Sequence, residues 1–117
     1  TLKMTPSFIA VTQDFAVSPQ LQAQDMAYVA SQGYKTVVNN RPDEEGGPTQ
    51  PRSADLARAA QAAGLQYVYL PVVGGAITAE QAQAMGELLH TMPAPVLAFC
   101  RSGARSAQLF SLAQAGR

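Results

Sequence analysis

Short apolar runs alternate along this chain with segments whose apolar residues recur at helical spacing. The runs expected to form strands cover residues 8–11, 15–17, 35–39, 66–72 and 96–99. The segments expected to form helices lie between Pro19 and Gly33 and at residues 52–63, 78–91 and 106–115. Such alternation is typical of strand-helix-strand units that share a parallel sheet. We therefore predict an α/β fold with a central, mainly parallel sheet flanked by helices.

Capping residues indicate where several of these helices begin. Ser18 is expected to cap the first helix, because its hydroxyl can accept a backbone hydrogen bond and Pro19 suits a first helical turn. Thr78 and Gln81 match a capping box for the third helix. Residues 40–51, with three prolines and two glycines, form a polar loop that we expect at the carboxyl edge of the sheet.

The composition indicates one domain that covers residues 1–117. With 47% hydrophobic and 14% charged residues, the chain can bury a single core. The absence of an initial Met and the end soon after a helix-like stretch favour a domain trimmed or excised from a longer protein, truncated at its C-terminus.

Charge and cysteine content exclude several classes of function. Eight basic and eight acidic side chains cancel, so we expect neither nucleic acid nor an anionic membrane as a partner. No apolar run approaches the length that spans a bilayer. The single cysteine excludes an internal disulfide and favours a reducing cytoplasm.

The last predicted strand leads directly into Cys100-Arg101-Ser102-Gly103-Ala104-Arg105, and a helix follows at once. Ligands of open α/β sheets bind at this edge, and the N–H groups of such a loop can converge on an anion. The same positive environment should lower the pKa of the thiol and produce a nucleophilic thiolate. The catalytic candidates are Cys100 and Arg105, and the candidates for the anion-binding loop are Arg101, Ser102, Gly103, Ala104 and Ser106.

For several candidate residues, two interpretations remain open. The alternative for Cys100 is a buried, inert thiol. Arg41 follows a strand that ends at the same edge, so it either lines the pocket or pins the long loop. Asp43 and the two glutamates after it either supply an acid or form a solvated turn.

Gly74 and Gly75 form either a hinge that lets the backbone approach the substrate or a plain turn. His90 is expected at a surface or a helix end, and one cysteine with one histidine makes no zinc set. We therefore expect neither a metal nor a cofactor.

The Cys100 loop resembles the active-site loop of single-domain rhodaneses, which also place four residues between Cys and Arg. The whole chain resembles the phosphatase-like domain of the β-lactamase-hydrolase-like family, a bacterial group with a protein-tyrosine- or dual-specificity-phosphatase-like fold. The motifs that carry this resemblance are residues 17–20, Asn40-Arg41-Pro42-Asp43-Glu44-Glu45, Gln50-Pro51, residues 62–65, Pro71-Val72 and residues 100–106. The resemblance implies either a phosphatase or a sulfurtransferase.

Three features favour sulfur over phosphate. The Cys-to-Arg loop is one residue shorter than in phosphatases of the resembling fold, which also place His before the Cys, where this chain has Phe99. Those phosphatases carry an Asp general acid in the loop that here spans residues 71–78 and contains no carboxylate. We therefore expect a rhodanese-like sulfurtransferase that carries sulfane sulfur as a Cys100 persulfide.

The expected partners follow from that chemistry. Thiosulfate or glutathione persulfide would donate the sulfur and a thiol or cyanide would accept it, and the resemblance adds a persulfide dioxygenase as a candidate partner. A cysteine-dependent phosphatase that forms a phosphocysteine intermediate is the alternative enzyme. A non-catalytic sulfur carrier or interaction module is the alternative from another class.

Overall fold

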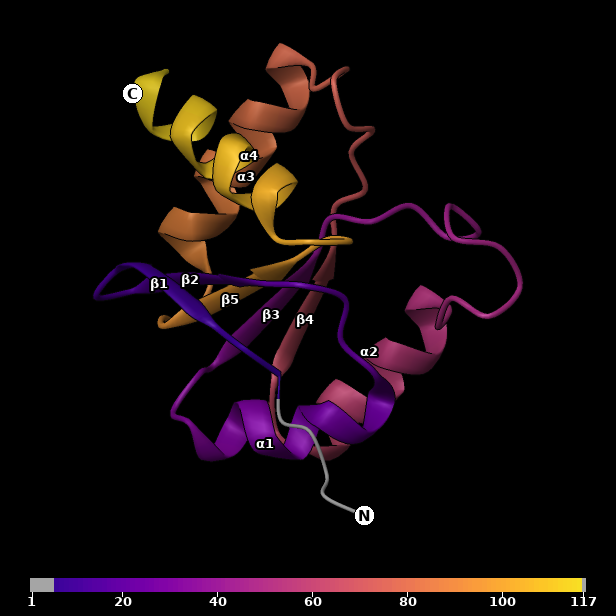
Figure 1. The fold of residues 1–117 in the computed structure, drawn as a ribbon. Coiled ribbons are helices and arrows are strands. Elements are labelled where there is room, and N and C mark those ends of the chain that lie inside the picture. The colour runs from indigo at the N-terminus through magenta and orange to yellow at the C-terminus, as the bar shows by residue number, and fades with distance from the viewer. Residues whose placement is uncertain (1–5, 117) are drawn as a thin grey trace.

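A five-stranded sheet forms the centre of the computed structural model, which describes residues 6–116 (Figure 1). The strands are β1 (Ile9–Thr12), β2 (Phe15–Ser18), β3 (Thr36–Asn39), β4 (Gln66–Tyr69) and β5 (Val96–Phe99). Their order in the sheet is β1-β2-β5-β3-β4. β1 pairs with β2 antiparallel, and the other three pairs are parallel. The predicted mainly parallel α/β sheet is therefore confirmed.

Helices cover both faces of this sheet (Figure 1). They are α1 (Met26–Ser31), preceded by the short 3-10 turn η1 (Ala23–Asp25), α2 (Ser53–Ala62), α3 (Ala79–Thr91) and α4 (Ala104–Ala115). Helices α1 and α2 lie on one face, and α3 and α4 lie on the other.

Strand β5 supplies both layers of the core, because successive side chains of a strand point to opposite faces. Val96 and Ala98 pack in the cluster that includes Met85 of α3 and Leu109 of α4. Leu97 and Phe99 pack in the other cluster, which contains Leu56 of α2 and residues of α1. A strand buried on both faces consists of one continuous apolar run, which explains why the sequence predicted β5.

The predicted start of the first helix was wrong. Ser18 is the last residue of β2, and its hydroxyl donates a hydrogen bond to the carbonyl of Pro19 at 2.8 Å. The helical region begins later, where a carboxylate oxygen of Asp25 accepts the N–H of Gln22 at 2.7 Å. This local carboxylate satisfies a helix-end donor in place of Ser18.

Two other element boundaries differ from the prediction by two residues or more, and the capping box agrees with it. β4 ends at Tyr69 because Pro71 has no N–H, although Val72 still donates to the carbonyl of Asn40 at 3.0 Å. Helix α4 starts at Ala104, earlier than the expected residue 106. The hydroxyl of Thr78 accepts the N–H of Gln81 at 3.1 Å, as the capping box predicts.

This topology determines at which edge of the sheet the loops can form a functional site. β5 lies between β2 and β3, and it runs parallel to both. The carboxyl ends of all three strands therefore meet at one edge of the sheet. Cys100 leaves β5 at this edge, beside the end of β2 and the start of the loop after β3.

We predict that Leu56→Ala destabilises the fold by about 2–5 kcal/mol, because Leu56 is fully buried between α2 and the sheet. The matched control is Leu112→Ala, whose side chain is 41% exposed and should cost under about 1 kcal/mol. Urea unfolding measures both. Equal losses of unfolding free energy in the two variants would contradict the core as described.

Candidate functional site

Cys100 lies buried at the end of β5, and its sulfur accepts the N–H of Gly103 at 3.1 Å. Burial alone would raise the pKa of this thiol. Hydrogen bonds to the sulfur, chiefly from the backbone at Ser106, Gly103 and Ser102, outweigh burial, so the pKa of Cys100 is lowered. The partial positive charge at the start of α4 acts in the same direction. The site therefore favours a thiolate.

Gly103 allows the loop to close over this sulfur. It is the N-cap residue of α4, and its φ of 97° lies in the left-handed region that side chains rarely adopt. A Cβ at this position would also lie 3.3 Å from the carbonyl oxygen of Ser18. The donation of the Gly103 N–H to the sulfur thus depends on a residue without a side chain.

Ser106 links the thiol loop to the end of β3. Its buried hydroxyl donates to Oδ1 of Asn40 at 2.8 Å, and Nδ2 of Asn40 donates to the carbonyl of Leu70 at 2.9 Å. The second bond determines which way the amide faces. Because a serine hydroxyl has one proton, it cannot donate to Asn40 and to Cys100 at once. In this structure the proton faces Asn40, and the backbone N–H groups carry the stabilisation of the thiolate.

Arg105 forms a two-pronged ion pair with Glu45 of the loop after β3. Nη1 donates to Oε2 of Glu45 at 2.9 Å, and Nη2 donates to Oε1 at 3.0 Å. Nη1 also donates to the carbonyl of Val72 at 3.0 Å. The hydrogen bonds from Arg105, followed by those from Arg41, outweigh partial burial and lower the pKa of Glu45. Glu45 is therefore ionised at neutral pH.

Arg41 joins the same group from the other side. Its Nε donates to Oε1 of Glu45 at 3.0 Å, and its Nη1 donates to Oε1 of Gln20 at 3.0 Å. The N–H of Gln20 in turn donates to the carbonyl of Arg101 in the thiol loop at 3.2 Å. Arg41 thus ties the loop after β3 to Glu45 and Gln20. A place for Arg41 in a substrate pocket stays a prediction.

The other candidates from the sequence occupy more peripheral places. Asp43 accepts the N–H of Ser53 at 2.8 Å, which caps α2, so its observed contact is structural. Gly74 and Gly75 form a turn closed by the N–H of Ala76 on the carbonyl of Val73 at 3.0 Å. The two glycines therefore lie in a turn, and their role as a hinge stays a prediction. A Cβ on Gly74 would lie 3.4 Å from Nε of Arg105.

The remaining residues of the thiol loop differ in exposure. Arg101 and Ser102 are exposed, and Ser102 accepts the N–H of Ala104, the exposed first residue of α4, at 3.4 Å. The sequence named Gln20 and Asn40 only within the motifs of the family resemblance and not as site candidates, whereas the structure places both against the loop. Asn40 carried a signal, because a polar residue directly after a buried strand needs a partner within the protein.

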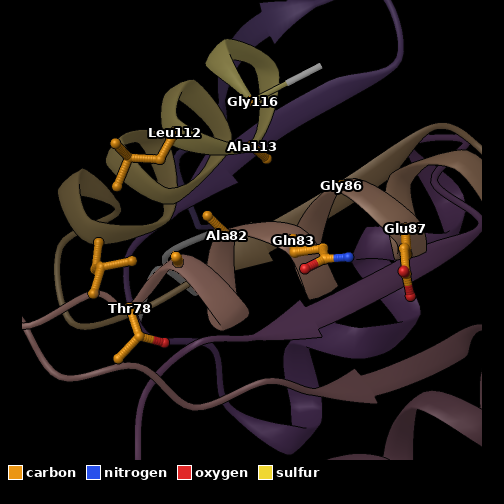
Figure 2. Close-up of a pocket in the computed structure, with 10 residues that line it drawn as sticks. Thr78, Ala82, Gln83, Gly86, Glu87, Leu112, Ala113 and Gly116 are labelled. Carbon is orange, nitrogen blue, oxygen red and sulfur yellow. The ribbon is translucent and has the colours of Figure 1, made fainter.

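Some features of the described residues lie apart from this chemistry. A hollow of about 610 Å³ opens between α3 and the C-terminal part of α4 (Figure 2), and no residue of the thiol loop lines it. Residues 6–116 contain no cluster of three or more His, Cys, Asp or Glu side chains that could hold a metal. Within the same range, no helix is long and apolar enough to cross a membrane.

The fold is that of the tyrosine and dual-specificity phosphatases, with the thiol loop at the carboxyl edge of the sheet. A protein of Neisseria meningitidis Z2491 named as a candidate phosphatase matches at a TM-score of 0.81 and 31% identity, over 87% of this chain and 72% of that one. The catalytic core of the PP-IP phosphatase Siw14 from S. cerevisiae matches at 0.70 and 16% identity, over 91% of this chain and 64% of that one, which shows the fold alone.

The chain belongs to the family of the phosphatase-like domain of beta-lactamase hydrolase-like proteins, whose model matches residues 7–117. Relatives of that name are 34% identical over 91% of this chain in Xylella fastidiosa and 32% identical over 92% in Agrobacterium fabrum. The chain spans 24% and 25% of their lengths. The family resemblance noted in the sequence is therefore confirmed.

We predict that Cys100 ionises at a pH below the ordinary thiol range. A group with a lowered pKa becomes charged earlier as the pH rises, so the thiolate should already be present near neutral pH. The ultraviolet absorbance of the thiolate, followed during a pH titration with Cys100→Ser as the blank, measures this ionisation. A midpoint at or above that of a free thiol would contradict the electrostatic description of the loop.

Gly103→Ala should raise the pKa of Cys100 towards its ordinary value, because the variant cannot hold the φ that directs the N–H to the sulfur. Gly33→Ala is the matched control, since Gly33 has a similar φ of 94° and no atom within 4 Å of an added Cβ. Both variants should lose about 1–2 kcal/mol of unfolding free energy from backbone strain. Only Gly103→Ala should move the thiolate titration, and equal titrations would refute the role of Gly103.

Proposed function

We propose that this domain is a cysteine-dependent phosphatase in which Cys100 attacks a phosphate ester. The observation that carries the proposal is the sulfur of Cys100, which accepts a loop N–H at the start of α4 with Arg105 in the same loop. Membership of a phosphatase-like family and the phosphatase names of its structural neighbours support it.

The reaction has two displacements at phosphorus. The thiolate forms an S–P bond while the P–O bond to the leaving group breaks, and the leaving group departs with the electron pair. Water then attacks phosphorus, the S–P bond breaks, and phosphate and the thiolate are released. Backbone N–H groups of the loop and the guanidinium of Arg105 stabilise the charge on the phosphoryl oxygens in both steps.

The choice of substrate follows from the acids available. Residues 71–78 contain no carboxylate, and the pKa of Glu45 is lowered by its two arginine partners, which makes Glu45 a poor proton donor. Leaving groups that depart without a proton are therefore preferred. Aryl phosphates and phosphoric anhydrides meet this requirement, whereas simple alkyl phosphates do not.

Sulfur transfer is the second candidate, and the short spacing from Cys100 to Arg105 favours it. A shorter loop closes more tightly around one atom than around a phosphoryl group. The thiolate would attack the outer sulfur of thiosulfate, form a persulfide and release sulfite with the electron pair of the broken S–S bond. A thiol or cyanide would then remove that sulfur and restore the thiolate. Glutathione persulfide is the alternative donor, with a persulfide dioxygenase as a candidate partner of the domain.

One experiment separates the two proposals. The protein is mixed separately with an aryl phosphate, thiosulfate and glutathione persulfide, quenched with acid, and the Cys100 peptide is weighed by mass spectrometry. Released phosphate and sulfur delivered to cyanide are measured in parallel, with Cys100→Ser as the control.

We expect a phosphoryl adduct on Cys100 and release of phosphate that Cys100→Ser abolishes. An added sulfur atom with turnover, and no release of phosphate, would replace the phosphatase proposal with sulfur transfer. Full activity of Cys100→Ser on any of the three substrates would refute both.

A further inference from the structure

The loop between β3 and α2 supplies several of the contacts to the thiol loop, although it has no regular structure of its own. Residues 40–51, all of which the structure describes, form turns but neither a helix nor a strand. Asn40 accepts the hydroxyl of Ser106 at 2.8 Å, and Arg41 reaches the thiol loop through Gln20. Ordering a loop of this length costs conformational entropy, so contacts at its ends are needed to hold it.

The hydroxyl of Tyr67, in the edge strand β4, joins the two ends of this loop (Figure 1). Nδ2 of Asn39, the last residue of β3, donates to this hydroxyl at 3.0 Å. Oγ of Ser53, the first residue of α2, lies 2.8 Å from the same hydroxyl. Asn39 and Ser53 are both buried. One phenol therefore contacts the residues that flank the loop on either side.

The phenol of Tyr67 keeps its proton at neutral pH. Burial is the main cause that raises the pKa of Tyr67 above its ordinary value. A protonated phenol can accept from Asn39 and donate to Oγ of Ser53 at the same time. The ring packs against the core cluster that contains Leu56, which holds the hydroxyl between its two partners.

Asn39 transmits this contact to the start of the loop. With its Nδ2 bound to the phenol, its Oδ1 accepts the N–H of Arg41 at 2.9 Å. This turn fixes the backbone on both sides of Asn40, which lies between them. Ser53 acts at the other end, where its N–H donates to Oδ1 of Asp43 at 2.8 Å. Both ends of the loop thus depend on partners of one hydroxyl.

We propose that Tyr67 is a positioning residue whose hydroxyl clamps the two ends of the loop 40–51 and so holds Asn40 and Arg41 against the thiol loop. Its effect on anion binding rests on the proposed function, because that function assigns the oxyanion to the thiol loop. The role is the same for phosphoryl and for sulfur transfer. It belongs to a residue of the edge strand β4, which β3 separates from β5.

The test compares Tyr67→Phe with the parent in the full chain, because this change removes the hydroxyl and keeps the ring. The backbone N–H groups of Arg41 and Gln20 should exchange with solvent about tenfold faster by NMR, since the loop loses its clamp. The affinity for inorganic phosphate, measured by isothermal titration calorimetry, should fall about fivefold, because the thiol loop is held less precisely. Tyr34→Phe is the matched control, since it removes a phenol hydroxyl from the same core cluster before β3, and it should change neither quantity.

Ser53→Ala shows whether the two hydroxyls form one clamp. Alone, it should weaken phosphate binding, and in the Tyr67→Phe background it should change binding less than about twofold, since the clamp is already open. A full additional loss in that background would show that the hydroxyls act separately. Unchanged exchange and affinity in Tyr67→Phe, or equal changes in Tyr34→Phe, would show that the phenol only stabilises the fold. Each of these three results overturns the proposal.

Two further outcomes separate this proposal from the proposed function. If phosphate esters turn over but Tyr67→Phe changes neither exchange nor phosphate affinity, the role of Tyr67 fails and the proposed activity stands. If the parent binds no phosphate, yet Tyr67→Phe speeds exchange at Arg41 and Gln20, the proposed activity loses its anion site and the clamp stands.

Discussion

Hydrogen bonding at the start of α4 is the constraint on which the site depends. The first N–H groups of a helix have no partner within the helix, and a charged sulfur buried without donors would be unstable. Where β5 ends and α4 begins, the N–H of Gly103 donates to the sulfur of Cys100, so the helix-end donor and the buried sulfur each gain a partner. The left-handed backbone of Gly103 directs one N–H at the sulfur, and a Cβ there would be strained and would lie 3.3 Å from the carbonyl oxygen of Ser18.

The loop after β3 connects this thiol loop to the rest of the sheet edge. Asn40 binds the hydroxyl of Ser106, and Glu45 holds the guanidinium of Arg105. Arg41 reaches the carbonyl of Arg101 through Gln20. The loop after β3 therefore contacts the thiol loop at Arg105 and Ser106, and at Arg101 through Gln20. The thiol loop and the loop of residues 40–51 therefore hold each other in place.

The sequence predicted most of the fold, because the responsible signals are local. The apolar run at residues 96–99 and the capping box at Thr78 each report their own surroundings, and both appear as expected. The prediction at Ser18 failed because a hydroxyl before Pro19 resembles a helix cap, whereas pairing with β5 extends strand β2 to include Ser18. Tertiary pairing of this kind overrides a local preference.

Within the site, the sequence indicated Cys100 and Arg105 but not which side chains contact the thiol loop. Cys100 and Arg105 stood out because four residues of a glycine-containing loop separate them at the start of a helix. The partnership of Glu45 with Arg105 joins positions far apart in the chain, and no local pattern encodes it. The place of Asn40 directly after a buried strand indicated that it needs a partner, but not that its partners are Ser106 and Leu70, which come from other elements.

The most direct test of this account is a crystal structure of the Cys100→Ser variant with a bound oxyanion such as phosphate. We expect the anion to accept hydrogen bonds from N–H groups of residues 101–106 and from Nε and Nη2 of Arg105, with Glu45 still paired to Nη1 and Nη2. An anion bound elsewhere, or one that takes the place of Glu45 on Arg105, would contradict it.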